Sequence, residues 1–352
     1  MIEFSKPLAD ARNYPAPTIF GLPSSQHLSE SVPRVFPQGV SKHWHLDRGR
    51  SALYVLAKSI SANKVWCPAY HCPALVEPFL AAGKQVNFYS ITEELNPDFS
   101  QLEQELKAGD VVINIRYFGF DCGVQKLAEI CQQKNTVLIE DLAHAMYTGK
   151  VYGKAAITSI VKFLPVKTGA ELLVTDAFQN KSEVQNFIDN LPSVTFERVL
   201  SFFRKVKNKL GIKDPLSTFR YFSMRRISKN VVGSDKAVIS AYSHQANKQK
   251  RRENYQYLAE RLVESGLGEV VFPSLPDDIV PYVLPFKLND AASFDDIRKQ
   301  GLQIYRWEEL APTSCEVSQK FRDSLIQLPV HQSLTREDLN CIISIIKKAK
   351  RG

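Results

Sequence analysis

Three short stretches of the sequence combine residue types that could act together on one ligand. In the first, TVLIEDLAHAM, Asp141 follows the apolar run 137–139. Such a run predicts a strand of a parallel sheet, and open α/β sheets bind ligands at the carboxyl ends of their strands. A carboxylate buried there needs a cationic or hydrogen-bonding partner, for example a protonated ring nitrogen. An equally weighted interpretation is that Asp141 caps a helix formed by LAHAM, because aspartate is a preferred N-cap.

The other two stretches offer a phosphate site and an amine. GRSAL, at 49–53, puts a glycine turn before an expected helix, whose first N–H groups attract phosphate, with Arg50 and Ser51 as extra donors. A capped helix start without a ligand is the commoner meaning of that pattern. Lys167, in FLPVKTG, is either a solvated loop charge or a desolvated amine with a lowered pKa and nucleophilic character. A phosphate cradle, a carboxylate for a ring nitrogen and an amine for an aldehyde are the contacts that pyridoxal phosphate needs.

The elements that would position these residues follow a strand–helix alternation. After a proline-rich segment at 1–45, which we interpret as an N-terminal arm, β-rich apolar runs such as KVWCP and QVNFYSI alternate with helical patterns such as PALVEPFLAAG. The alternation predicts an α/β fold with a large, mostly parallel sheet in a cofactor-binding domain at 46–240. This domain would include a basic insert at 196–230. A smaller α+β domain is expected at 241–352.

The order of the motifs resembles that of the DegT/StrS-type sugar aminotransferases, a branch of the fold-type I pyridoxal-phosphate enzymes. The resemblance runs from about residue 40 to the end of the chain. It is carried by GRSAL at 49–53, VWCPAYHCPA at 65–74, IRYFG at 115–119, IEDLAHA at 139–145, FLPVK at 163–167 and LPVHQSLTREDL at 328–339. It implies the fold-type I aminotransferase architecture and a site at the interface of a homodimer.

The resemblance also implies roles for individual residues. Lys167 would bind the cofactor aldehyde and carry the α-proton, and Asp141 would pair with the pyridinium nitrogen. His144 would lie near the ring hydroxyl, and Tyr70 or Cys72 would cover the ring face. Gly49, Arg50 and Ser51 would hold the phosphate.

One departure from the family pattern concerns the phosphate site and the reactive amine together. Many members have a phosphate-binding serine five residues before the lysine, and Lys162 stands there in this chain. Lys162 would either neutralise the phosphate or itself be the reactive amine. The turn after Lys167 is also shorter than in most members.

The composition limits the classes of partner. The chain has 352 residues, 44% of them hydrophobic and 23% charged, and a formal net charge of +8, which favours anionic ligands. Its six cysteines include no C-x-x-C pair, so we expect reduced thiols and a cytoplasmic location. His43 and His45 have no third ligand nearby in the sequence, and no metal site is expected. Neither a signal peptide nor a membrane span is expected.

The basic insert leaves two interpretations open. Its segment 198–229 contains many Lys and Arg residues and a helical apolar stripe. A helix of this kind either packs on its own domain or a second subunit, the favoured interpretation, or contacts an anionic membrane surface. Nucleic-acid binding is not expected, because no known module is present.

The predicted function is pyridoxal-phosphate-dependent transfer of an amino group to a keto-sugar linked to a nucleotide, in polysaccharide biosynthesis. An amino acid, expected to be glutamate, would be the donor, and Tyr305, Arg306 and Trp307 would line the substrate entrance. The alternative is a non-catalytic protein that keeps the fold to bind a nucleotide-sugar or a membrane partner.

Overall fold

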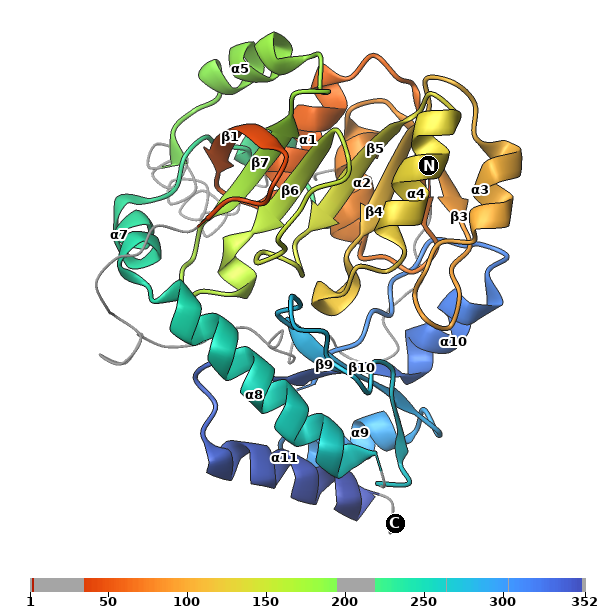
Figure 1. Cartoon of the computed structure of the whole chain (residues 1–352), viewed down its shortest axis with the longest axis vertical. Helices are drawn as coiled ribbons and strands as arrows, with labels where there is room; N and C mark the ends of the chain where they lie inside the picture. Colours follow the sequence, from red (N-terminus) through yellow and green to blue (C-terminus); the bar gives the residue numbers. More distant parts are fainter. Residues whose placement is uncertain (1, 3–34, 195–218, 264, 303, 350–352) are drawn as a thin grey trace, which may run out of the picture.

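The computed structural model describes residues 2, 35–194, 219–263, 265–302 and 304–349. Their largest feature is a seven-stranded sheet in the order β1-β7-β6-β5-β4-β2-β3 (Figure 1). The strands from β6 to β3 in that order run parallel to their neighbours, whereas β7 is antiparallel to both β6 and β1. The strands are β1 (Val40–Leu46), β2 (Lys64–Pro68), β3 (Gln85–Tyr89), β4 (Val111–Ile115), β5 (Val137–Leu142), β6 (Ala155–Ser159) and β7 (Ala170–Thr175).

Helices cover this sheet, which explains its apolar central strands. All five residues of β4 and of β6 are buried, as expected for parallel strands packed on both faces. Helix α1 lies against β6 and β7 and beside α2, while α4 lies against β5 and beside α3. The helices of this part are α1 (Gly49–Ser59), α2 (Pro73–Ala81), α3 (Phe99–Glu105), α4 (Val124–Gln133) and α5 (Lys181–Asp189). The predicted mixed α/β class with a large, mostly parallel sheet is confirmed.

A second, antiparallel sheet lies in the C-terminal part of the chain, below the large sheet in Figure 1. Its strand order is β10-β9-β8. Helix α8 connects this part to the rest and packs against α11 and the small sheet. The strands are β8 (Gly268–Val270), β9 (Val283–Leu288) and β10 (Leu325–Pro329), and the helices are α7 (Gly233–Ala241), α8 (His244–Leu262), α9 (Ser293–Lys299), α10 (Glu316–Ser324) and α11 (Arg336–Ala349).

Two parts of the chain differ from what the sequence indicated or lie outside the described residues. The end of the expected arm, from Val40, is an edge strand of the large sheet, because Trp44 and Leu46 alternate inward against β7. The remainder of that arm at 3–34, and the basic insert as far as residue 218, lie outside the described residues. Among the helices that are described, none is long and apolar enough to cross a membrane.

Candidate active site

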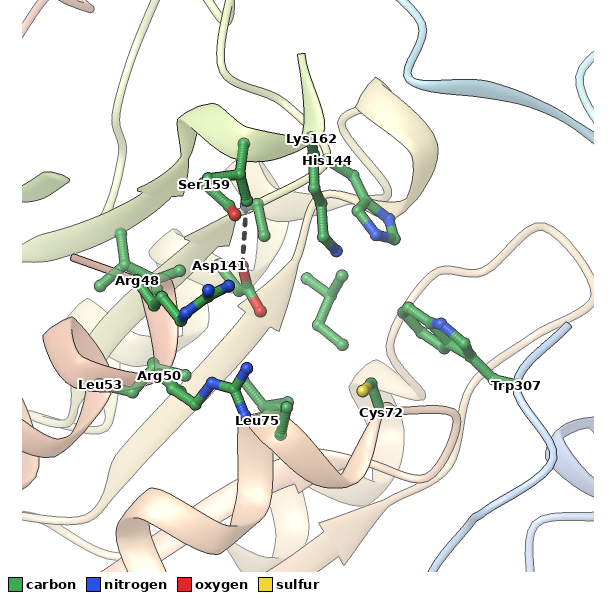
Figure 2. A pocket seen from close by; sticks show the side chains of 16 residues that line it. Arg48, Arg50, Leu53, Cys72, Leu75, Asp141, His144, Ser159, Lys162 and Trp307 are labelled. Carbon is green, nitrogen blue, oxygen red and sulfur yellow. Dashed lines mark hydrogen bonds between the residues drawn. The ribbon is translucent and has the colours of Figure 1, made fainter. Parts of the chain in front are cut away.

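A pocket lies beyond the carboxyl ends of β4, β5 and β6, where the starts of α1 and α2 also meet. Figure 2 shows Arg48 and Arg50 on one side of this pocket, Lys162 and His144 on the other, and Asp141 between them. Cys72 and Trp307 also line it. The pocket is therefore built from segments that lie far apart in the sequence, as is usual at the strand ends of an open α/β sheet.

Asp141 reaches the pocket because it is the penultimate residue of β5. It pairs with β4 on one side and β6 on the other, and its side chain is only 9% exposed. One carboxylate oxygen accepts the N–H of Ala143 at 2.8 Å (dashed in Figure 2). Burial raises the pKa of Asp141, and the charge of Lys162 and the Ala143 N–H oppose that rise. No helix follows Asp141, so the helix-cap interpretation is wrong: the carboxylate caps a turn and faces the pocket.

Lys162 is the lysine of the pocket. It ends the short 3₁₀ turn η4 (Ile160–Lys162) that follows β6, and its ammonium lies 5.4 Å from the ring centre of Tyr282. Burial lowers the pKa of Lys162, against the opposing effect of the Asp141 carboxylate. This combination gives an amine near a carboxylate in a largely desolvated place, which favours nucleophilic behaviour.

Lys167 lies outside the pocket, and the expected placement of its side chain there is wrong. It is exposed and does not line the cavity. The reason is the fold of its turn: the backbone N–H and hydroxyl of Thr168 both donate to Asp235, at 2.8 and 2.7 Å. The inward direction at this point is taken by Thr168, and Lys167 is left on the outside.

The first turn of α1 supplies the groups that could bind a phosphate. Gly49 and Arg50 line the pocket, and no side chain caps the helix. The N–H groups of Ser51 and Ala52 bond to the carbonyl of Arg48, which leaves those of Gly49 and Arg50 without intrahelical partners. Ser51 differs from expectation, because it is buried and does not line the pocket.

An aromatic wall closes the side next to Lys162. The ring of His144 stacks on Tyr282 at 4.6 Å and on Phe118 at 5.6 Å between centroids, and it also contacts Trp307. Burial and the nearby charge of Lys162 lower the pKa of His144 well below its usual range. His144 is therefore a neutral ring held in place by stacking.

The two residues predicted to cover a ring face occupy different places. Cys72, at the N-cap of α2, lines the pocket, and burial raises the pKa of its thiol. Tyr70 is fully buried behind the pocket, where its ring packs against Trp307 at 5.0 Å. Tyr70 thus supports the wall through Trp307. Of the residues suggested for a substrate entrance, Trp307 lines the pocket, and Arg306 is buried in an ion pair with Glu308.

Residues 49–171 match the model of the DegT/DnrJ/EryC1/StrS aminotransferase family. This is the segment that contains Gly49, Asp141 and Lys162, and the resemblance predicted from the motifs is confirmed by it. The matched family is one of pyridoxal-phosphate-dependent aminotransferases. The sequence has no significant match among curated proteins.

Solved structures show that the likeness in fold extends over most of the chain. The aminotransferase PseC from Helicobacter pylori, involved in pseudoaminic acid biosynthesis, has a TM-score of 0.68 at 16% identity, covering 88% of this chain and 87% of that one. The putative sugar aminotransferase Spr1654 from Streptococcus pneumoniae in its PLP form also has a TM-score of 0.68, at 14% identity over 89% and 88%. The aminotransferase TlmJ from Streptoalloteichus hindustanus has 0.67, at 16% identity over 88% and 86%.

Two pocket residues of this chain were not predicted from its sequence. Ser159, the last residue of β6, and Arg48, just before α1, both line the pocket beside Asp141. A signal for Ser159 existed, because it ends an apolar run three residues before a lysine. Arg48 carried no such signal. With Arg50 and Lys162 it gives the lining three cations against one carboxylate.

Proposed function

We propose that this protein is a pyridoxal-phosphate-dependent aminotransferase with Lys162, rather than Lys167, as its reactive lysine. The single observation that carries the proposal is the convergence of Lys162, Asp141 and the first turn of α1 on one pocket. Residue types alone left both lysines open, and the exposed position of Lys167 now favours Lys162.

The residues present fit pyridoxal phosphate. The uncapped start of α1 and the guanidinium of Arg50 match a doubly charged phosphate. Asp141 offers a buried carboxylate for a ring nitrogen, and Lys162 offers an amine for an aldehyde. The excess of positive charge in the lining suits an anionic ligand.

Lys162, Asp141 and His144 would each have a separate role toward the cofactor. When bound, the cofactor supplies an electron sink for bond breaking at the carbon that bears the amino group. Lys162 would hold the cofactor through Nζ and carry a proton at that atom, aided by its lowered pKa. Asp141 would accept the ring N–H and keep it protonated, while the Ala143 N–H fixes the carboxylate. His144, neutral and stacked, would stand beside the ring without adding charge.

The phosphate end would be held by backbone and side-chain donors. The N–H groups of Gly49 and Arg50 and the guanidinium groups of Arg48 and Arg50 are available around this end of the pocket. Ser159 adds a hydroxyl at the end of β6. Lys162 would then be free of the phosphate-neutralising role that its sequence position first indicated.

For the substrate we propose a keto-sugar carried on a nucleotide, with an amino acid, glutamate, as donor. Support comes from two similar solved structures, one described as a sugar aminotransferase and one as involved in the biosynthesis of pseudoaminic acid. The aromatic face of Trp307 on the pocket wall suits a sugar ring, and the net positive charge suits a nucleotide diphosphate.

The remaining features of the proposal concern assembly and location. We propose a cytoplasmic homodimer and a division into a large domain at 46–240 and a small one at 241–352. Membrane-surface contact through 198–229 also stays a proposal, because most of that segment lies outside the described residues.

The experiment is a half-reaction on purified protein loaded with pyridoxal phosphate. We expect L-glutamate to abolish the visible band of the covalently held cofactor, and an added keto-sugar nucleotide to restore it. The Lys162→Ala variant should lack the band, and the matched Lys167→Ala variant should behave as wild type. A wild-type protein that develops no band would support the alternative, a non-catalytic binding protein on this fold.

A further inference from the structure

Residues 219–222 form a strap that contacts both α1 and α2. The ring of Phe222 packs on Tyr54 of α1, with centroids 5.1 Å apart. At the other edge, the Tyr221 hydroxyl donates to Glu309, which also pairs with Arg220. The strap therefore bridges α1 and the segment that carries Trp307.

Glu77 of α2 holds the backbone of this strap. One of its carboxylate oxygens accepts the N–H of Arg220 at 3.1 Å, and the other accepts the N–H of Tyr221 at 2.7 Å. The Glu77 side chain is only 2% exposed. An acidic residue buried at this depth on a helix surface needs such partners, because an unpaired buried carboxylate is costly.

The strap in turn binds the pocket arginine. The guanidinium of Arg50 donates one hydrogen bond to the carbonyl of Tyr221. This carbonyl belongs to the peptide that directly follows the two peptides whose N–H groups bind Glu77. Because a guanidinium is planar and rigid, one fixed N–H sets the direction of the others. Figure 2 shows the guanidinium at the edge of the pocket, below Asp141.

We propose that Glu77 is a positioning residue for the ligand phosphate: by holding residues 220–221 it fixes the Tyr221 carbonyl, which orients the Arg50 guanidinium into the pocket. The proposal rests on the proposed function, since it needs a phosphate at the start of α1. Both oxygens of Glu77 must be acceptors for the geometry to hold. A glutamine would turn an N–H₂ group towards one of the two strap N–H groups and lose one bond.

The ionisation of Glu77 gives this arrangement a pH dependence. Burial raises the pKa of Glu77 to about 7, while the strap N–H groups and the charge of Arg50 oppose the rise and Glu309 adds to it. Arg220 is the other charged group at the strap. Below that pH Glu77 gains a proton and loses one acceptor, so the strap and Arg50 are held less firmly. The affinity for a phosphate ligand should then fall as the pH falls through 7.

The experiment compares two probes, pyridoxal phosphate and pyridoxal, which differ only in the phosphate. Their dissociation constants would be measured by absorbance titration between pH 6 and 8 for wild type, Glu77→Gln and a control, Arg220→Ala. The control removes the side chain that pairs with Glu309 and keeps the backbone N–H to Glu77. Any effect of the phosphate's own ionisation is common to all three proteins.

We expect Glu77→Gln to weaken pyridoxal phosphate binding about tenfold at pH 8, the effect of one charge-assisted hydrogen bond, and to leave pyridoxal binding unchanged. At pH 6 the dissociation constant of wild type for pyridoxal phosphate should approach that of Glu77→Gln. Arg220→Ala should bind both probes as wild type does at every pH. The proposal would be overturned if Glu77→Gln lost affinity for both probes equally, or if the affinities of wild type and Glu77→Gln for pyridoxal phosphate did not converge as the pH falls. Either result would leave the proposed function intact. Wild type that binds neither probe would instead overturn the proposed function. If Glu77→Gln does not fold, Arg50→Lys takes its place: because the ionisation of the phosphate is the same for both proteins, an equal pH dependence of the ratio of the two affinities in wild type and Arg50→Lys refutes the proposal.

Discussion

Replacing Gln332 by leucine should destabilise the turn that carries Lys162. Gln332 is 2% exposed and connects the two parts of the fold. Its amide nitrogen donates to the carbonyl of Phe163 at 2.9 Å and to the Tyr242 hydroxyl at 2.7 Å, and its oxygen accepts from Arg251 at 3.0 Å. Phe163 directly follows Lys162, so the bond to its carbonyl fixes the backbone one residue beyond the pocket lysine.

The expected cost follows from the bonds that are lost. Two neutral hydrogen bonds contribute about 1 kcal/mol each, and the bond to a guanidinium about 1.5–3 kcal/mol. Arg251 keeps its bonds to Asn247 and to the carbonyls of Pro281 and Tyr282, and leucine gains from apolar burial. We therefore expect a loss of about 3 kcal/mol in the free energy of unfolding, and weaker pyridoxal phosphate binding.

Gln327 offers a matched control within the same part of the chain. It is 1% exposed on β10, but its side-chain nitrogen has no hydrogen-bond partner among the described residues. Gln327→Leu should cost less than about 1 kcal/mol, because no bond of that nitrogen is lost. Urea unfolding followed by circular dichroism would give both values. Equal losses for the two variants would refute the inferred role of the Gln332 bonds.

Two further predictions concern a buried histidine next to Cys72 and the tryptophan of the pocket wall. Burial lowers the pKa of His71 to about 4, and its Nε2 accepts the N–H of Ala311 at 3.2 Å. In the folded chain His71 therefore binds a proton less readily than in the unfolded chain. Through His71, the free energy of unfolding should fall by about 3 kcal/mol as the pH falls from about 6.5 through 4. His71→Leu should remove this share of the fall, as measured by urea titrations at each pH. Trp307→Phe should remove most of the quenching of tryptophan fluorescence that pyridoxal phosphate causes, because Trp307 lines the pocket. Trp44→Phe, on the edge strand outside the pocket, should retain this quenching. Equal quenching in the two variants would place the ligand elsewhere.

The parts of the site that the sequence predicted are those fixed by local structure. Asp141 follows an apolar strand directly, so its place at the end of β5 needed only the strand pattern. The start of α1 likewise followed from GRSAL and the helical pattern behind it. The edge strand β1 was missed although KHWHL alternates, because its outward positions are polar and the segment before it is rich in proline.

The choice between the two lysines could not be made from the sequence. Both follow β6 within eight residues, and each is preceded or followed by apolar residues. What separates them is the direction of the turn, which depends on Asp235 binding Thr168 and on Gln332 binding Phe163, from positions 67 and 169 residues away. The strap held by Glu77 depends on a contact between residues 143 positions apart. Side-chain direction set by such distant partners has no local signal.

The central claim is that Lys162 is the lysine that holds the cofactor. The most direct measurement is reduction of the loaded protein with borohydride, followed by mass mapping of the peptide that carries the pyridoxyl group. We expect the label on Lys162 and none on Lys167. A label on Lys167 would contradict it, because that side chain lies outside the pocket, and a protein without any label would contradict the aminotransferase function itself.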